Sequence, residues 1–385
     1  MRKKNIMQIC LSPDLGGLEL YLKQCVDALS DDFSITTVIG EKTKLKEYFD
    51  EKGIAYFQVA RAKPLQALFR AKKLAKIIDD NKIEIIHMHW TKDILLVVLA
   101  KLFSKQKPKI IQSRHMHMTR FKDDFYHRFL YKNVDTILAV TQEVKEELKR
   151  YIPDSIRPKI EQLYLGCDTV ELLDEAQLRA KKDELGIYHD SFNIGLVGRI
   201  EPAKGQHLLI EAIKMLNDKN INAHAHLVGN PMKDEYLETL NTQISYHDIK
   251  ENIHFLGYLK NPAHFYQAND VMVLATENET FGLVLIEAMR TQTCVVGANR
   301  GGVLEIIDDK KTGLLFESQN SEDLANKLEI LYHDKTKREA ISQAGYHKVS
   351  CEFDNVKQFE KLKSILKKIE AHYHGNYKRF NTKKV

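Results

Sequence analysis

The sequence has no long apolar run, and no hydrophobic stretch approaches the ~18 residues that a membrane-spanning helix requires. The basic start MRKKNIMQICL is followed at once by the turn sequence SPDLGG, so its apolar part is too short for a signal peptide. We therefore expect this segment to form a first β-strand, and we expect the protein to be cytoplasmic.

Cysteine is scarce and scattered. The chain of 385 residues has five cysteines and no Cys-x-x-Cys pair: Cys10, Cys25, Cys167, Cys294 and Cys351. An odd, unpaired set is typical of a reducing compartment and argues against both a disulfide framework and a cysteine-based zinc site.

Charge is unevenly distributed along the chain, although the net charge is only +5. Residues 1–170 hold 30 Lys and Arg against 22 Asp and Glu, and residues 171–355 hold 19 against 29. Residues 356–385 are basic again, with 9 against 2. A basic front and tail around an acidic middle predict that one end of the molecule meets an anionic partner.

Short strand-like runs alternate with amphipathic helical stretches, which is typical of βαβ units and a parallel sheet. The strand-like runs are NIMQICLS, FSITTVIG, IEIIHMHW, KIIQSRH and TILAVT, then FNIGLVGRI, AHAHLVG, IHFLGY, VMVLAT and TCVVGA. Between the two sets lies a charged helical segment at about 170–190, and domains of roughly 100–200 residues are usual. We predict an α/β protein with two doubly wound, Rossmann-like domains over 1–170 and 186–354. A helix over about 355–385 is expected to pack back on the first domain.

Ligands of open α/β sheets bind outside the carboxyl ends of the strands, so the loops at those ends are the places to search. Two facing domains would place a cleft between such loops. The first loop, SPDLGGLELY, has Gly16 and Gly17 at a helix start, where free N–H groups favour anions. A tight strand-to-helix turn explains the same glycines equally well.

The sequence GLVGRIEPAKGQHLLIEAI follows the first strand of the second domain. Arg199 and Lys204 lie between that strand and the next helix, with Gly205 at the turn. Two fixed cations beside a helix N-terminus suit a diphosphate, whereas the segment taken alone favours a solvated basic loop. GLVG is not a G-x-G-x-x-G fingerprint, so a nicotinamide cofactor gains little support.

The run LATENETFGLVLIEAM reads as a strand end, a loop and an apolar helix that carries a glutamate. Gly282 permits close approach at the first helical turn, where free amides bind phosphate. Glu279 lies in the loop, and Glu287 shares a helix face with Leu283 and Val284. A carboxylate on so apolar a helix needs a partner.

The joint pattern resembles the donor-binding region of retaining GT-B glycosyltransferases of family 4. That family has roughly S-x-x-E-x-F-G-x-x-x-x-E-A-M, then G-G-x-x-E and T-G-L-L, which are matched within the run ANDVMVLATENETFGLVLIEAMRTQTCVVGANRGGVLEIIDDKKTGLLF. VGRIEPAKG resembles its phosphate-binding loop, LYLGCD its interdomain step and SPDLGGLE its N-terminal loop. The resemblance covers about residues 10–350, in order.

The resemblance implies a role for each matching residue. Arg199 and Lys204 would hold the donor diphosphate, Glu287 would accept hydrogen bonds from the ribose hydroxyls, and Glu279 would contact hydroxyls of the donor sugar. His115, which follows KIIQSRH, matches the family histidine near the reacting sugar. The implied catalytic set is His115, Glu279, Arg199 and Lys204. The implied donor-binding set is Gly16, Gly17, Arg199, Lys204, Tyr258, Glu279, Phe281, Gly282, Leu283 and Glu287.

Four positions depart from the family pattern. Ala275 replaces a usual proline, Gln292 and Cys294 replace a glycine and a proline, and Leu165 replaces an asparagine. We interpret these as scaffold positions that remove no expected ligand contact.

Three histidine pairs raise the question of a metal site: His-x-His occurs at 87–89, 115–117 and 224–226. Residues two apart in a strand share a face, so each pair could chelate zinc. Core or strand-end histidines are the competing interpretation, and it is favoured because no acidic or cysteine third ligand is apparent. We predict no metal; His115 is the favoured catalytic histidine, ahead of its neighbours His89 and His117.

A basic amphipathic stretch spans residues 61–78, RAKPLQALFRAKKLAKII, and further lysines follow at 101–109. One interpretation is an ordinary surface helix on a sheet. The other is docking to anionic lipid head groups or to a lipid-linked acceptor. Nucleic acid is disfavoured because no aromatic-interleaved basic motif is present.

The resemblance thus predicts a retaining glycosyltransferase that uses a nucleoside-diphosphate sugar of UDP or GDP type and needs no cofactor or metal. The resemblance implies front-face attack and a glycan or lipid-linked acceptor in surface polysaccharide or lipopolysaccharide synthesis. The membrane interpretation of the basic stretch adds peripheral contact at the inner membrane face. Two alternatives stay open: a sugar-nucleotide epimerase or hydrolase of similar fold, and a non-catalytic sugar-nucleotide-binding protein. Nucleoside diphosphate release that depends on an acceptor separates the first hypothesis from the other two.

Overall fold

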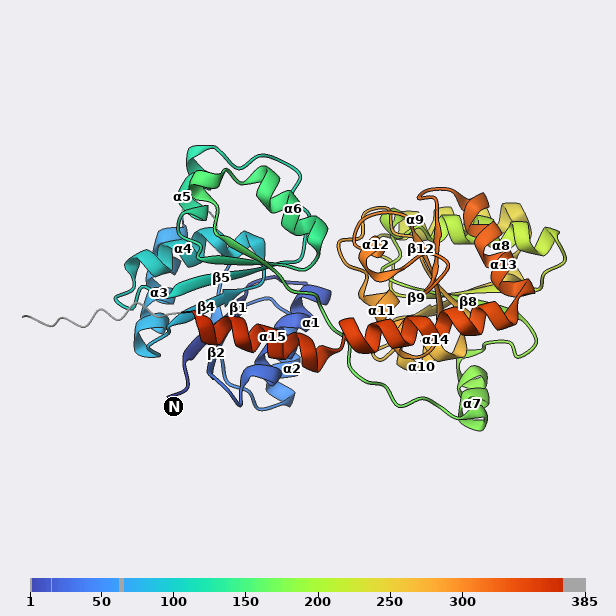
Figure 1. Cartoon of the computed structure of the whole chain (residues 1–385), viewed down its shortest axis with the longest axis horizontal. Coiled ribbons are helices and arrows are strands. Elements are labelled where there is room, and N and C mark those ends of the chain that lie inside the picture. The colour runs from blue at the N-terminus through green and yellow to red at the C-terminus, as the bar shows by residue number, and fades with distance from the viewer. Residues whose placement is uncertain (1, 15, 62–65, 370–385) are drawn as a thin grey trace, which may run out of the picture. The chain divides into compact units, whose positions relative to one another are not determined.

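The structure, a computed structural model, describes residues 2–14, 16–61 and 66–369 (Figure 1). It divides into two compact units. Unit 1 comprises Met1–Ala139, Lys145–Glu161 and Phe359–Val385, and unit 2 comprises Val140–Val144 and Gln162–Gln358. Parts of two predictions, residues 62–65 of the basic stretch and residues 370–385 of the terminal helix, lie outside the described residues.

Unit 1 is built on a parallel sheet of seven strands in the order β3-β2-β1-β4-β5-β6-β7. Its central strands are apolar on both faces, as expected for a sheet covered by helices on each side. Ile6, for example, pairs with Ile35 of β2 and with Ile85 of β4. The strands are β1 (Asn5–Cys10), β2 (Ser34–Gly40), β3 (Tyr56–Val59), β4 (Ile85–Met88), β5 (Lys109–Arg114), β6 (Thr136–Ala139) and β7 (Lys159–Gln162).

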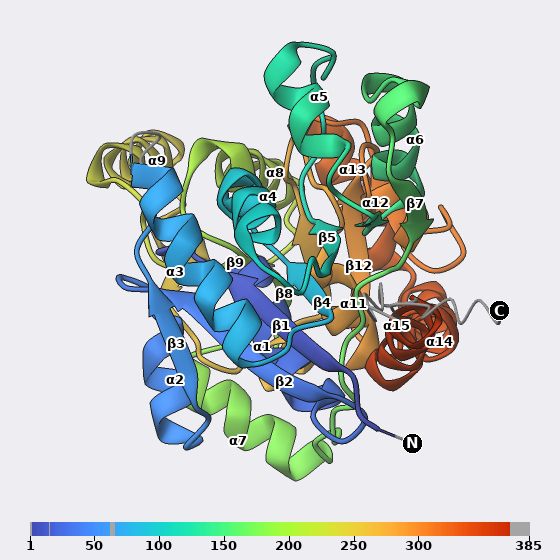
Figure 2. The same ribbon diagram turned by 90° about the vertical axis from the view of Figure 1, so that its left-hand side faces the viewer.

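Helices connect these strands, and α3 and α4 lie side by side (Figure 2). The helices along this part of the chain are α1 (Gly17–Leu29), α2 (Leu45–Glu51), α3 (Ala67–Asp80), α4 (Ile94–Phe103), α5 (Phe125–Tyr131) and α6 (Gln142–Tyr151), with 3₁₀ turns at Thr91–Asp93 and Asp154–Ile156. No helix among the described residues is long and apolar enough to cross a membrane.

Unit 2 repeats the design with six parallel strands in the order β10-β9-β8-β11-β12-β13. The strands are β8 (Phe192–Val197), β9 (Ala223–Val228), β10 (Ile253–Gly257), β11 (Val271–Leu274), β12 (Cys294–Ala298) and β13 (Leu314–Phe316). The helices are α7 (Glu175–Leu185), α8 (Gln206–Asp218), α9 (Asp234–His247), α10 (Ala263–Ala268), α11 (Leu283–Arg290), α12 (Val303–Ile306), α13 (Ser321–His333) and α14 (Lys335–Glu352), with 3₁₀ turns at Pro202–Lys204 and Lys250–Asn252.

Local sequence explains where several helices begin. The side chains of Asp174, Asn320 and Asp334 each accept a hydrogen bond from the backbone N–H three residues later, at the starts of α7, α13 and α14. Such caps satisfy N–H groups that have no partner within the helix. Apolar residues of β8, β9, β11 and β12 then pack with those of α8 and α13 into one core.

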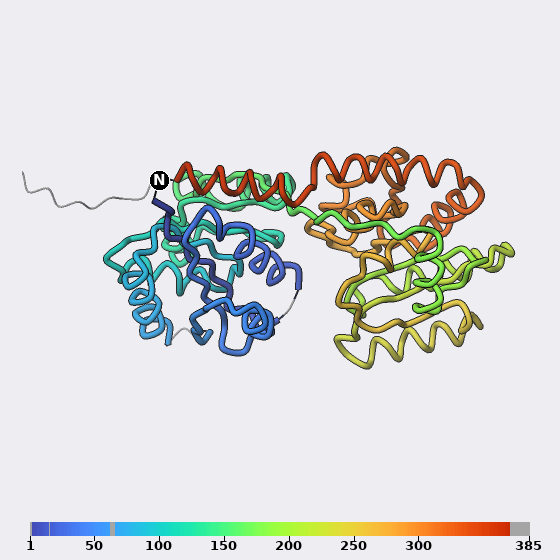
Figure 3. The backbone as a smooth tube through the Cα atoms, turned by 90° about the horizontal axis from the view of Figure 1, so that it is seen from below, coloured from blue at the N-terminus to red at the C-terminus, as the bar shows by residue number. Residues whose placement is uncertain are grey.

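The predicted fold class, two doubly wound α/β domains, is confirmed. Strands β3, β7 and β13 lie outside the ten predicted runs. All three are edge strands of their sheets, and β3 and β7 are partly exposed and therefore less apolar than the central strands. The terminal helix α15 (Asn355–Lys368) ends before the predicted limit of 385. Its last turns lie against the start of the chain, where Lys4 Nζ donates to the carbonyls of Lys367 (2.8 Å) and Ile369 (2.6 Å) (Figure 3).

The strand order reverses direction once in each sheet, between β1 and β4 in unit 1 and between β8 and β11 in unit 2. Loops at such a switch point diverge to opposite faces of the sheet and leave a crevice at the carboxyl ends of the strands. In unit 2 these loops are residues 198–205 after β8 and 275–282 after β11. They are the two loops that the sequence singled out.

Candidate functional site

The two loops at the switch point of unit 2 are joined to each other. The backbone N–H of Glu277 donates to the carbonyl of Ala203 (3.2 Å). Gly205 has φ +72°, and a Cβ there would lie 2.5 Å from the carbonyl oxygen of Ala275. Glycine is therefore required at 205 both for its backbone conformation and for the close approach of the loops.

Lys204 and Glu279 meet across this junction. Lys204 Nζ lies 3.2 Å from Glu279 Oε2, and each side chain keeps about a fifth of its surface exposed (23% and 20%). The pair is thus desolvated in part but still open to a ligand. The structure brings together a cation and a carboxylate that are 75 residues apart in the sequence.

Arg199 lies on the same loop as Lys204 but is held differently. Its guanidinium is 59% exposed and pairs with Glu201 (3.0 Å), while its backbone carbonyl accepts a hydrogen bond from Gln206 (2.8 Å). The backbone is therefore fixed, while the charged end is held only by an exposed ion pair. Arg199 can reach an anion at the loop without breaking a buried contact.

A pair of glycines supports the loop that carries Glu279. The N–H of Gly302 donates to the Glu279 carbonyl (2.9 Å). A Cβ on Gly301 would lie 2.4 Å from that carbonyl oxygen, and a Cβ on Gly302 would lie 2.3 Å from the carbonyl oxygen of Thr280. These two glycines belong to the G-G-x-x-E motif, and they support the backbone of the loop at Glu279 and Thr280.

The start of α11 has no side-chain cap among the described residues. Gly282, with φ +102°, precedes Leu283 and has no side chain. Buried Phe281 holds the turn in place. Free N–H groups at the positive end of a helix bind anions such as phosphate.

Glu287, one turn into α11, has the partner that its apolar surroundings require. The Tyr266 hydroxyl donates to Glu287 Oε2 (2.6 Å). Burial raises the pKa of the Glu287 carboxyl, the Tyr266 hydrogen bond opposes that rise, and nearby Asp168 adds to it. Tyr266 was not predicted from the sequence, where the available signal was only that a buried carboxylate needs a donor.

Tyr258 directly follows β10 and is 63% exposed. It lies at the carboxyl edge of the same sheet, after a left-handed Gly257 (φ +68°). An exposed ring at this edge is accessible for stacking on a planar ligand.

In unit 1 the predicted glycine loop leads into α1. Gly17 is the first residue of that helix, and the Gly16 N–H donates to Glu19 Oε2 (2.9 Å). The Gly16 amide therefore already has an acceptor, and it would bind an anion only after the Glu19 side chain moved away.

His115 follows β5 on a loop that neighbouring charges hold rigidly. Arg114 donates to the carbonyls of Met116 (2.7 Å) and His117 (2.6 Å), and Glu147 accepts from the Met118 N–H (2.8 Å). Burial and then Arg114 lower the pKa of His115 to about 4, so its imidazole is neutral near pH 7.

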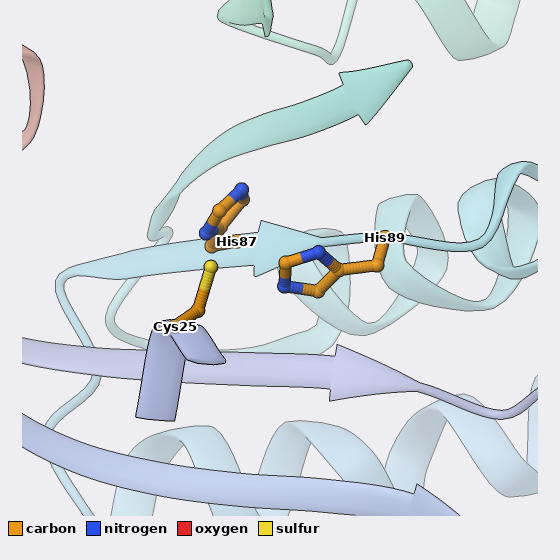
Figure 4. Close-up of side chains that lie close together, drawn as sticks. All are labelled: Cys25, His87 and His89. Carbon is orange, nitrogen blue, oxygen red and sulfur yellow. The ribbon is translucent and has the colours of Figure 1, made fainter. Parts of the chain in front are cut away.

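Two expectations about the histidine pairs are wrong. His117 does not share a strand face with His115, because β5 ends at Arg114 and His117 pairs instead with Glu147 (3.0 Å). A cysteine does accompany His87 and His89, since α1 packs against β1, the neighbour of β4 in the sheet, and Cys25 of α1 lies next to them (Figure 4).

This group of Cys25, His87 and His89 is sealed in the core. The three ligand atoms lie within 4.8 Å of one another, and none of the three side chains is exposed. Burial raises the pKa of the Cys25 thiol and lowers that of His87 to about 3, so the group is uncharged near pH 7. Both histidines also have Nε2 partners, Ser113 and Gln8, each at 2.8 Å.

The third pair lies in β9 of unit 2, where His224 and His226 are joined by His254 of β10. His224 Nδ1 is 3.1 Å from His254 Nε2, and the stacked rings of His226 and His254 have their centroids 4.9 Å apart. The Nε2 of His226 contacts Asn193 (3.0 Å). These are hydrogen-bonded core histidines rather than converging ligands.

Comparison with known proteins gives a consistent result. The family described as "Glycosyl transferases group 1" matches residues 178–348, and "Glycosyl transferase 4-like" matches residues 8–141. The chain is 31% identical over 197 residues, half of each chain, to the capsular polysaccharide biosynthesis glycosyltransferase CapM of Staphylococcus aureus. It is 28% identical over 312 residues to an uncharacterized 41.2 kDa protein in the cps region of Klebsiella pneumoniae, which covers 76% of this chain and 81% of that one.

Solved structures resemble the chain over nearly its whole length. The Anabaena protein Alr3699/HepE in complex with UDP has a TM-score of 0.83 at 20% identity, covering 96% of this chain and 100% of that one. A glycosyltransferase from Rickettsia africae has a TM-score of 0.86 at 21% identity, covering 95% and 98%.

Proposed function

The chain belongs to the group 1 glycosyltransferases and has their two-domain GT-B fold, and from this premise we propose that it is a retaining enzyme that uses a nucleoside-diphosphate sugar. The sugar passes to a glycan or lipid-linked acceptor in the synthesis of a surface polysaccharide. One observation carries the proposal: Lys204 and Glu279 meet at the switch point of unit 2.

The pair suits the two ends of a sugar nucleotide. A lysine ammonium is a compact charge that binds diphosphate, and a carboxylate accepts hydrogen bonds from sugar hydroxyls. Lys204 and Glu279 neutralise each other's charge while they are paired. A bound sugar nucleotide would replace this one contact with two, its diphosphate on Lys204 and its sugar on Glu279. The uncapped amides at the start of α11 supply further donors for the diphosphate.

The donor is of the UDP type. HepE, which shares this fold, was crystallised with UDP and with UDP-glucose. In our proposal the Glu287 carboxylate accepts hydrogen bonds from the ribose hydroxyls, and Tyr258 lies against the base. GDP is the competing donor type and is a direct comparison in the test below.

The chemistry is mainly stabilisation of the leaving group. As the bond from the anomeric carbon to the diphosphate oxygen breaks, negative charge grows on the diphosphate, and Lys204, Arg199 and the α11 amides offset it. The acceptor hydroxyl attacks from the same face, and its proton passes to a donor phosphate oxygen. His115 of unit 1 is neutral near pH 7, and we propose that it acts as a hydrogen-bonding group rather than as an acid. The reaction uses no metal ion and no cofactor.

The acceptor end is in unit 1, and we place a membrane-facing surface on α3. Leu68 and Phe69 are 57% and 79% exposed there, next to Lys72 and Lys73. Lys72 Nζ lies 5.9 Å from the ring centroid of Phe103 in α4. Exposed apolar side chains beside lysines suit anionic lipid head groups at the inner membrane face. Sedimentation with anionic vesicles should fall for Phe69→Ser with Lys72→Ala, and neutral vesicles should bind neither form.

The decisive experiment is ligand binding followed by turnover. Thermal unfolding is measured with UDP, GDP and ADP, because a ligand that binds the native state raises the midpoint. Nucleoside diphosphate release from the matching sugar nucleotides is then followed with and without a glycan or lipid-linked acceptor. UDP stabilisation with acceptor-dependent release supports the proposal. Release that ignores the acceptor indicates a hydrolase, and stabilisation without turnover indicates a binding protein.

A further inference from the structure

We propose that Tyr266 is a positioning residue that holds the Glu287 carboxylate in the orientation and ionised form needed to receive the ribose hydroxyls. The inference rests on the proposed function, because Glu287 matters for turnover only if a nucleotide binds there. It adds a residue on α10 that lies outside the two loops of the site.

The geometry of the contact is short and fixed. The Tyr266 hydroxyl donates to Glu287 Oε2 at 2.6 Å, a length typical of an O–H bonded to a carboxylate. The ring is 1% exposed, so it has no room to swing away. The backbone is fastened as well, because the Thr293 hydroxyl donates to the Tyr266 carbonyl (2.9 Å).

The contact occupies one carboxylate oxygen and leaves the other free. Among the described residues none hydrogen-bonds to Glu287 Oε1. A ribose presents two adjacent hydroxyls, and an ionised carboxylate can accept several hydrogen bonds through its two oxygens. Tyr266 therefore anchors one side of the group while the other side faces the ligand.

The hydrogen bond from Tyr266 also favours the ionised form of the Glu287 carboxyl. The first effect on Glu287 is burial, which raises its pKa, and the negative charge of Asp168 raises it further. The Tyr266 hydrogen bond lowers it and is the opposing influence. The titratable and charged groups around this carboxylate are Tyr266 of α10, Cys167 and Asp168 before α7, and Arg290 of α11 with its ion-pair partner Asp354 at 2.7 Å.

Removal of the hydroxyl should therefore change the pH dependence of binding. Without it the Glu287 carboxyl retains its proton to a higher pH, and a protonated carboxyl accepts fewer hydrogen bonds from the ribose. A merely structural tyrosine would weaken binding equally at all pH values. The pH profile separates these two roles.

The test compares Tyr266→Phe with Tyr236→Phe. Tyr236 is a matched control, because its hydroxyl also has one side-chain partner, His207 Nδ1 at 3.0 Å, and it lies in unit 2 away from Glu287. Calorimetric Kd values for UDP are measured from about pH 5 to pH 9, and circular dichroism verifies folding. We expect Tyr266→Phe to move the acid-side loss of affinity upward by about one pH unit, which is about tenfold in Kd at a pH within that transition. Tyr236→Phe should follow the wild-type curve.

Glu287→Gln is a second variant for the same measurement of Kd against pH, and it leaves Tyr266 unchanged. It should bind UDP weakly and lack the acid transition altogether. If the transition persists in Glu287→Gln, or if Tyr266→Phe keeps the wild-type profile, the inference is overturned. Failure of the wild-type protein to bind any nucleotide would instead overturn the proposed function.

Discussion

Lys204 Nζ and Glu279 Oε2 lie 3.2 Å apart although the two residues belong to different βα loops. The contact follows from topology, because β8 and β11 are neighbours at the point where the strand order of unit 2 reverses. It joins the residue proposed for the diphosphate to the residue proposed for the sugar.

Lys204→Ala should lower kcat by about 10²–10³-fold, because it removes a charge that stabilises the departing diphosphate. The free-energy cost to folding should be small, since the side chain is partly exposed. Steady-state kinetics with a saturating sugar nucleotide measures the effect. Lys214→Ala is the control: this lysine of α8 pairs with Asp218, and its loss should leave kcat unchanged. Equal activity of both variants would contradict the assignment.

Gly302→Ala should displace the loop that carries Glu279, because Gly302 supports that loop from below. The new Cβ would lie 2.3 Å from the Thr280 carbonyl oxygen, so the loop that carries Glu279 must move. We expect about 1–3 kcal/mol of lost stability and weaker donor binding. In Gly186→Ala the Cβ meets no atom within 4 Å, but the residue has φ +67°. That control should cost about 1–2 kcal/mol of backbone strain and leave UDP affinity unaltered.

His226 should make unit 2 sensitive to acid. Burial first, and then the charges of His254, His224 and Lys182, lower its folded pKa to about 3 from an ordinary 6.5. A lowered histidine pKa means that the unfolded chain binds the proton first, so stability falls as pH drops from about 6.5 toward 3. Urea unfolding at several pH values should show a shallower acid loss for His226→Asn. An unchanged slope would assign the acid sensitivity to other groups.

Asp93 should have the opposite pH dependence in unit 1. Burial raises its pKa to about 7, although it accepts a hydrogen bond from the Leu11 N–H (2.9 Å). The folded state then binds the proton more tightly, so its contribution to stability is present at low pH and is lost as pH rises through about 7. Asp93→Asn keeps an acceptor for Leu11 and should remove this loss, a gain on the order of 1–3 kcal/mol above pH 7. Asp80→Asn, at an exposed position of α3, should show no such gain.

Most of the strands and the two candidate loops of unit 2 were predictable from local sequence. The ten predicted strand-like runs correspond to ten of the strands in the two sheets, since both faces of these strands are buried and they are correspondingly apolar. The loops of Lys204 and Glu279 could be picked out because residues at strand ends carry ligands in such folds. The three strands that were not predicted, β3, β7 and β13, are edge strands, where pairing on one side only requires a less apolar sequence or a shorter strand.

The amino-acid pattern was sufficient for the fold class and for the choice of two candidate loops, because periodicity and turn residues act over a few neighbours. Partners that are distant in the chain were beyond its reach: Cys25 beside His87 and His89, Gly302 beneath Thr280, and Tyr266 on Glu287. Those contacts depend on strand order and helix packing, which place residues side by side regardless of their separation in sequence. The position of Glu287 in an apolar helix indicated that it needs a hydrogen-bond partner. The packing of α10 against α11 identified that partner as Tyr266.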